Sequence, residues 1–381
     1  MKTLLFAGGS RAGNEFFLSL LDGHSQILQF PGTLRGNNDL RRILSHKKSE
    51  DIANNFIYQY KHFFDSRLSN DPDLTNLERH NELGMNKKKF YSVNIKKFKE
   101  IFIKISKKNN NLISNNYLFN NLVNLHKAYF LADKRNIKRI KLMVINSHLI
   151  SYTKFFAKKI LNNDKFDIVH TTRHPLSAIS SSLNNWINYK SGRVFFANSI
   201  FFQLNLIVNG IKNLRKINKN LYLIKLESMH LNNKKVMNEF CSFYKLRSEK
   251  CLKKSSFFKL LWWGDKISRK NLNGINKNFK IKYNKNIFYK KDFGFFNNVL
   301  KDFLLQYNYN IDNKPTDFFK NLAPLKCEMI TWKNTIRHKK IKHIFSIPYF
   351  YFKRIIFINF LGGLNNCYPK VFGELRSKEK I

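Results

Sequence analysis

A glycine-rich stretch near the amino terminus is the first candidate for chemistry. Gly8 and Gly13 have the G-x-x-x-x-G spacing of a phosphate-binding loop, between an apolar run at 4–7 and an apolar helix that begins near Glu15. Backbone N–H groups in such a loop, together with the N-terminus of the following helix, attract anions. The stretch therefore predicts an anion site in which Arg11 supplies the side-chain cation.

The residues after Gly13 argue against a nucleoside triphosphatase. Such an enzyme places Lys and then Ser or Thr there, to reach the outer phosphates and to hold magnesium. This chain has Asn14 and Glu15, and an ionised glutamate repels a triphosphate unless a metal intervenes. A fixed guanidinium suits a 5′-phosphosulfate, whose bridging oxygen gains charge as it leaves. A small-molecule kinase with the same loop and a glycine turn with a solvated arginine are the alternatives.

A second set of polar residues follows the strand predicted at 166–172. Arg173 comes directly after this strand, and Ser181 lies eight residues later, within the first two turns of the next predicted helix. A 3′-phosphate can accept a charge-assisted hydrogen bond from the arginine and another from the serine hydroxyl. Ser180 and Ser182 flank the candidate, so an ordinary helix start fits the same pattern.

Together these segments resemble the sulfotransferases that use 3′-phosphoadenosine 5′-phosphosulfate (PAPS). The resemblance is carried by GGSRAGNEFFLSLLDGH at 8–24, FDIVHTTRHPLSAISSSLNNW at 166–186, LYLIKLESMHLNNKKVMNEFCSFYKL at 221–246 and, more weakly, LWWGDKIS at 261–268. Their order and spacing match the family over roughly residues 1–308, with 33–138 unmatched. The family implies sulfonate transfer to an acceptor hydroxyl, with PAPS as co-substrate, 3′-phosphoadenosine 5′-phosphate as product and no metal.

The resemblance also assigns residues to the donor. The 5′-phosphosulfate loop would consist of Arg11, Ala12, Gly13, Asn14 and Glu15, and the 3′-phosphate would be held by Arg173 and Ser181. It further implies structural roles for Glu227, at a strand end, and for His24, at a helix end.

The loop departs from the family at its hydroxyl residues. The family usually has Ser-Gly-Thr and then Ser or Thr after the arginine, where this chain has Ala12, Gly13, Asn14 and Glu15. Asn14 can still donate a hydrogen bond through its amide. Glu15 cannot donate when ionised, so it either points away from the phosphate or faces the acceptor as a base.

The catalytic base is assigned to His148, with Glu15 as the second candidate and Arg11 as the residue that stabilises the leaving group. His148 follows the strand predicted at 142–145, and open α/β sheets bind ligands at that edge. A base must reach the acceptor hydroxyl within hydrogen-bond distance. A helix-capping or core histidine is the alternative for His148.

The elements that must position these residues alternate along the chain. Strands are predicted at 4–7, 142–145, 166–172 and 221–226, and helices at 15–21, 176–186, 198–214 and 236–244. This alternation predicts an α/β, P-loop-like three-layer sandwich with a central, mostly parallel sheet. We expect a sulfotransferase domain at 1–320 and a basic aromatic, helical tail at 321–381. Within that domain, 33–138 is expected to be a helical insertion, either an acceptor-binding segment or a plain cover.

The charge balance is strongly basic, with 69 Lys and Arg against 25 Asp and Glu. These residues are spread over nearly every segment, whereas a nucleic-acid footprint forms a stripe or cluster, so no nucleic-acid partner is expected. The four cysteines lie far apart without a CxxC pair, which suits a reducing compartment. The opening apolar run is too short for a signal peptide. Cytoplasm is the expected location.

Residues 343–361 are apolar and aromatic but are interrupted by Pro348, Lys353 and Arg354. Charges in the middle of this segment disfavour a membrane-spanning helix. Two interpretations stay open: an interfacial helix on an anionic membrane, and a helix docked on the core with its basic side chains reaching water.

The sequence thus favours a bacterial-type sulfotransferase acting on a hydroxyl of a carbohydrate or glycolipid. The alternatives are a small-molecule kinase or nucleotide-binding protein, and an inactive, sulfotransferase-like basic binding module.

Overall fold

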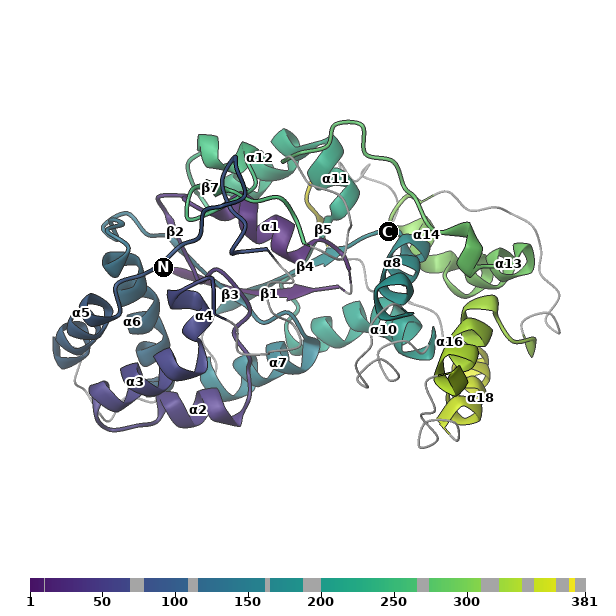
Figure 1. Ribbon diagram of the computed structural model, residues 1–381, viewed down its shortest axis with the longest axis horizontal. Coiled ribbons are helices and arrows are strands. Elements are labelled where there is room, and N and C mark those ends of the chain that lie inside the picture. Colours follow the sequence, from purple (N-terminus) through teal and green to yellow (C-terminus); the bar gives the residue numbers. More distant parts are fainter. Residues whose placement is uncertain are drawn as a thin grey trace.

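The structure, a computed structural model, describes residues 1–9, 11–68, 79–108, 116–161, 165–187, 200–265, 274–309, 322–337, 346–360 and 370–373. Within these ranges six strands form one sheet in the order β2-β3-β1-β4-β5-β8, and all neighbouring pairs are parallel (Figure 1). The strands are β1 (Lys2–Gly8), β2 (Ile27–Gln29), β3 (Leu142–Asn146), β4 (Phe166–Thr172), β5 (Leu221–Lys225) and β8 (Lys370–Val371). A separate hairpin joins β6 (Ser256–Phe257) and β7 (Leu260–Leu261).

The central strands are buried on both sides, so their side chains alternate between two cores. In β1, Leu4 and Phe6 enter one core, and Leu5 and Ala7 enter the other. β3 and β5 divide their apolar residues in the same way. This arrangement explains why these strands read as continuous apolar runs in the sequence.

Helices cover both faces of the sheet. On the Leu4 face lie α1 (Asn14–Leu21), α11 (Leu226–Leu231) and α12 (Asn233–Phe243), drawn above the sheet in Figure 1. On the opposite face lie α6 (Tyr117–Ala132), the π-helix η2 (Phe156–Ile160) after α7 (Ile150–Phe155), α8 (Pro175–Ile187) and α10 (Ile200–Ile217). The prediction of a parallel sheet between two helical layers is confirmed.

Within its described residues, the 33–138 region contains five helices, with turns and isolated bridges at 65–68 and 79–94, and it contributes to the second core. Besides α6, it contains α2 (Asn38–Leu44), α3 (Ser49–Gln59), α4 (Lys61–Phe64) and α5 (Ile95–Lys108). Phe30, which follows β2, stacks on Phe63 of α4 and lies against Phe56 of α3. Buried aromatic rings thus attach these helices to the sheet.

The carboxyl-terminal part holds α13 (Lys290–Val299), α14 (Lys301–Gln306), α16 (Lys326–Arg337) and α18 (Ser346–Phe360), with the short 3₁₀ turns η3 (Lys250–Lys253) and η4 (Lys285–Ile287) before them. Residues of the expected tail also enter the sheet, because β8 pairs with β5 and the next residue, Phe372, is fully buried. None of the helices in the described ranges is long and apolar enough to cross a bilayer.

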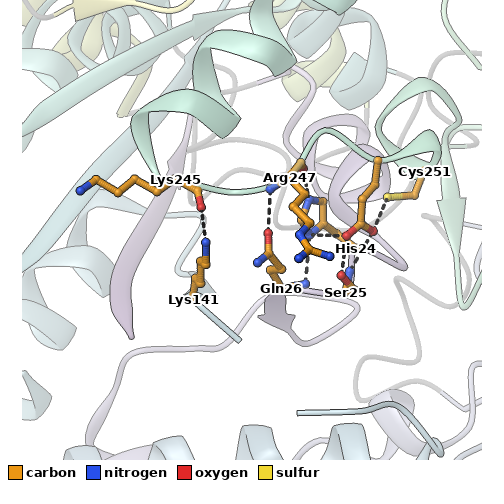
Figure 2. A network of polar contacts seen from close by, with 8 residues as sticks. His24, Ser25, Gln26, Lys141, Lys245, Arg247 and Cys251 are labelled. Carbon is orange, nitrogen blue, oxygen red and sulfur yellow. Dashed lines mark hydrogen bonds and ion pairs between the residues drawn. The ribbon is translucent and has the colours of Figure 1, made fainter. Parts of the chain in front are cut away.

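The amino edge of the sheet is closed by a polar network (Figure 2). The backbone N–H of Gln26 donates to His24 Nδ1 at 3.1 Å, so the neutral ring carries its proton on Nε2, 2.9 Å from the carbonyl oxygen of Arg247. The N–H of Arg247 in turn donates to the Gln26 side chain at 2.7 Å, and Glu249 accepts from Ser25. These bonds tie the chain before β2 to the chain after α12, which supports a structural role for His24.

Candidate anion-binding site

The loop between β1 and α1 rests against the end of β4. Gly9 donates its backbone N–H to the carbonyl of Thr171 at 3.0 Å, and a Cβ at Gly9 would lie 2.6 Å from that oxygen. Gly13 caps α1 with φ 82°, and a Cβ there would lie 2.5 Å from Leu226. Close backbone approach at Gly9 and the left-handed conformation at Gly13 therefore both require glycine.

The Arg11 guanidinium joins three distant segments. Its Nε donates to Ser181 Oγ at 3.2 Å, and its Nη1 lies 3.0 Å from Oδ2 of Asp265. The Arg11 side chain is 19% exposed and that of Asp265 is 24% exposed, so the ion pair is partly shielded from water. The structure thus brings together Arg11 and Ser181, which are 170 residues apart in the chain.

Arg173 lies directly behind this loop. Its Nη1 donates to the backbone carbonyl of Arg11 at 3.0 Å, whereas its Nε is closed off from solvent and has no hydrogen-bond partner within the described part of the chain. Burial lowers the pKa of Arg173 and neighbouring Glu227 opposes this shift, but a guanidinium remains charged. The Arg173 side chain therefore contacts the β1–α1 loop through the backbone of Arg11.

Glu227 fixes the start of α8. One carboxylate oxygen accepts from the backbone N–H of His174 at 2.8 Å, and the other accepts from the Tyr309 hydroxyl at 3.0 Å. The predicted strand over 221–226 ends one residue earlier than expected, because α11 starts at Leu226 and carries Glu227 in its first turn. The carboxylate joins the loops after β4 and α14, as expected for a structural residue.

The serines of α8 point to different partners. Ser177 donates to the carbonyl of Lys282 at 2.8 Å, and Ser180 accepts from the N–H of Asn284 at 2.8 Å. Only Ser181 of these three contacts Arg11. Ser177 and Ser180 hold the chain before α13 in place, and Ser181 faces the loop.

Asn14 lies across Gly8 and connects β4 with the chain just after β3. Its Oδ1 accepts from the Thr171 hydroxyl at 2.5 Å, and its Nδ2 lies 2.8 Å from His148 Nδ1. A Cβ at Gly8 would lie only 1.7 Å from that Nδ2. The amide predicted to donate to a phosphate is therefore held between Thr171 and His148.

His148 adjoins the loop through this amide. Burial, and then the charge of Arg11, lower the pKa of His148, so the ring is neutral at pH 7. Since Thr171 donates to Asn14 Oδ1, the amide donates to His148 Nδ1 and the proton of the ring sits on Nε2. In this tautomer Nε2 carries the ring proton and Nδ1 accepts from Asn14, whereas a catalytic base must accept a proton from the acceptor hydroxyl. The role of His148 as the base therefore stays a prediction.

Ala12 and Glu15 lie on either side of the helix start. Ala12 is 2% exposed, and its N–H donates to the carbonyl of Gly9 at 3.2 Å. Glu15 is half-buried in the first turn of α1, where the helix dipole favours an acidic side chain. This position gives Glu15 a structural explanation, and its role as a second base stays a prediction.

Sequence reasoning missed two members of the cluster. Asp265 belongs to the segment 261–268 that carries the weaker part of the resemblance, but nothing in its sequence context indicates an ion pair with Arg11. Thr171 is the penultimate residue of a correctly predicted strand, and its hydroxyl fixes the amide of Asn14. Among the residues that the structure describes, no group of three or more His, Cys, Asp or Glu could hold a metal ion.

Comparisons with known proteins give little guidance here. No protein-family model matches the sequence, and no curated protein matches it. Among solved structures, the sulfotransferase domain from the curacin biosynthetic pathway is 12% identical, with a TM-score of 0.39 over 82% of this chain and 99% of that domain. The sulfotransferase domain from the Synechococcus PCC 7002 olefin synthase is 14% identical, with a TM-score of 0.35 over 71% of this chain and 80% of that domain. Likenesses this distant carry no argument about activity.

Proposed function

We propose that this chain is a sulfotransferase that takes its sulfonate from PAPS and transfers it to an acceptor hydroxyl. The observation that carries the proposal is the Arg173 Nε, a cationic donor shut off from water without a partner in the described residues, on a side chain whose Nη1 donates to the backbone carbonyl of Arg11. Buried donors are nearly always satisfied, so such a group calls for an anionic ligand. PAPS has anionic groups at both its 3′ and 5′ positions.

The residues of the loop fit a 5′-phosphosulfate in part. In their favour are the backbone of the β1–α1 loop, the N-terminus of α1 and the guanidinium of Arg11. Two observations argue against this fit. The amide of Asn14 is hydrogen-bonded within the protein, and the carboxylate of Asp265 is already paired with Arg11. For the 3′-phosphate, Arg173 offers a cationic donor, while the Ser181 hydroxyl accepts from Arg11 and would have to be shared with the phosphate.

In the proposed reaction, PAPS brings the activated sulfonate and a stable bisphosphate leaving group. Arg11 would offset the charge that grows on the bridging oxygen, and Arg173 and Ser181 would hold the nucleotide so that the sulfonate faces the acceptor. His148, or Glu15 in second place, would take the acceptor proton. For His148 this requires the ring proton to move from Nε2.

The first test is nucleotide binding. We expect 3′-phosphoadenosine 5′-phosphate to bind in isothermal titration calorimetry without magnesium, and Arg11→Ala and Arg173→Ala each to weaken binding about a hundredfold, since each removes a charge-assisted contact. Unchanged affinity in both variants would refute the site. ATP binding that depends on magnesium would instead favour the kinase alternative.

The acceptor is proposed to be a carbohydrate or glycolipid. The helices of 33–138, which extend the second core beyond the sheet, are the proposed acceptor-binding cover. Transfer of radiolabelled sulfate from PAPS to a panel of glycans and glycolipids tests this proposal. Label on none of them, in a protein that binds the nucleotide, would favour the inactive binding module.

A peripheral contact of 343–361 with an anionic membrane is also proposed. Tyr349, Phe352 and Ile356 are each more than half exposed and lie at helical spacing on α18, and the sequence from 329 to 360 has several Lys and Arg residues but no acid. Phe352→Ser with Ile356→Ser should lower sedimentation with phosphatidylserine vesicles. Equal sedimentation of the variant and the unchanged protein would exclude this surface.

A further inference from the structure

Asp265 forms an ion pair with Arg11, the cation that binds the anionic nucleotide in the proposed function. Its Oδ2 lies 3.0 Å from Nη1 of Arg11, while Ser181 accepts from Nε of the same guanidinium. An anion that binds Arg11 closely must share these N–H groups with the carboxylate or displace it. Two negative groups a few ångströms apart in a partly shielded site repel one another strongly.

We propose that Asp265 is an exchangeable counter-anion of Arg11 that sets the affinity of the site for its nucleotide. Without ligand, it holds the guanidinium against Ser181 in a defined rotamer. When the 5′ anion of the nucleotide binds, Asp265 releases the guanidinium. This inference rests on the proposed function, since it assigns a residue to the same donor site.

The chain leading to Asp265 is firmly held, which limits the exchange to its last residues. Trp262 is 2% exposed, and the indole Nε1 of Trp263 donates to the carbonyl of Gly84 at 2.7 Å. Gly84 also donates its N–H to the carbonyl of Leu261 at 2.8 Å. The segment is thus anchored through Trp263 by the 33–138 region.

Gly264 separates the anchored chain from the carboxylate. It has φ 83°, a left-handed conformation that glycine adopts without strain and from which it can also leave easily. Rotation at Gly264 can therefore move Asp265 while Trp263 keeps its place.

The test is calorimetric titration with 3′-phosphoadenosine 5′-phosphate in magnesium-free, low-salt buffer. Asp265→Asn keeps the shape of the side chain and removes its charge, so binding should become roughly tenfold tighter. Asp265→Ser, which also removes the charge, should tighten binding as well. Asp265→Glu should stay near the unchanged protein. Glu50→Gln, an exposed acid on α3 away from the loop in Figure 1, makes the same charge change and should have no effect.

The possible results separate the two proposals. If the unchanged protein binds and the two neutral Asp265 variants bind equally well or more weakly, the counter-anion proposal is overturned and the sulfotransferase proposal stands. If the Glu50 variant tightens as much as the Asp265 variants, the effect is one of net charge, and the specific role of Asp265 is again overturned. If no protein in the series binds the nucleotide, the proposed function itself fails.

Discussion

Two arginines, Arg354 and Arg173, show how differently this protein satisfies a guanidinium. Arg354 of α18 is fully buried, and its Nε donates to Glu328 at 2.6 Å, its Nη2 donates to the carbonyl of Ala323 at 3.2 Å, and the ring of Phe295 lies 5.0 Å away. Arg173 has a bond to a backbone carbonyl and an Nε without a partner in the described chain.

The difference teaches where to look for a ligand. The Arg354–Glu328 pair is explained by the fold, because it joins α16 to α18 and satisfies the charges inside the protein. Arg173 is not explained in this way, since folding leaves part of its hydrogen-bonding capacity unused. An unsatisfied polar group lowers the stability of the folded state, and natural proteins retain such groups mainly at functional sites.

The largest expected effect breaks the satisfied pair. Arg354→Met leaves Glu328 buried without its counter-charge, so the free energy of unfolding should fall by about 3–5 kcal/mol in chemical denaturation. The double variant Arg354→Met with Glu328→Leu should recover most of this loss, because it removes both charges together. A single variant as stable as the unchanged protein would contradict the structural reading of this pair.

The corresponding substitution at Arg173 should change the stability little and weaken nucleotide binding strongly. Arg173→Met removes one hydrogen bond but also a poorly satisfied cation, so the free energy of unfolding should change by no more than about 1 kcal/mol. Binding of 3′-phosphoadenosine 5′-phosphate should nevertheless fall about a hundredfold, a loss that Arg354→Met should not share while it is folded. Equal destabilisation by the two substitutions would remove the distinction between the two arginines.

Lowering the pH should reduce the stability of the protein through His174, the residue that follows Arg173. Burial, followed by the charge of Arg173, lowers the pKa of His174 to about 4, against about 6.5 in the unfolded chain. The unfolded state therefore binds the extra proton between these values, so stability is lost as pH falls from 6.5 towards 4. His174→Gln should remove about 2 kcal/mol of the stability difference between pH 7 and pH 5, measured by denaturation at both values. An identical pH dependence in the variant would show that His174 does not titrate in this way.

The smallest expected effect concerns the serines of α8. Ser181→Ala removes a neutral hydroxyl from the Arg11 cluster, so nucleotide affinity should fall several-fold, in line with about 1 kcal/mol for one such hydrogen bond. Ser180→Ala is the matched control, because Ser180 bonds to Asn284 instead of the loop. Equal losses in both variants would indicate an effect on α8 as a whole.

Much of the fold was readable from the sequence. The strand predicted at 166–172 has the bounds of β4, and the helix predicted from Glu15 to Leu21 is α1 with one further residue at its start. Apolar runs, glycines and prolines act locally, so they give local information. The strands β2 and β8, with three and two residues, were not predicted, because so few residues carry no periodic signal.

The site was readable only in outline. The sequence alone determined that Arg11 and Arg173 follow strands of one parallel sheet, since the carboxyl ends of parallel strands share an edge. Tertiary structure decided which groups those arginines meet: Asp265 on Arg11, and the choice of Ser181 over its neighbours. These contacts join residues as far as 254 positions apart, and they depend on side-chain directions that only the packed sheet and helices fix.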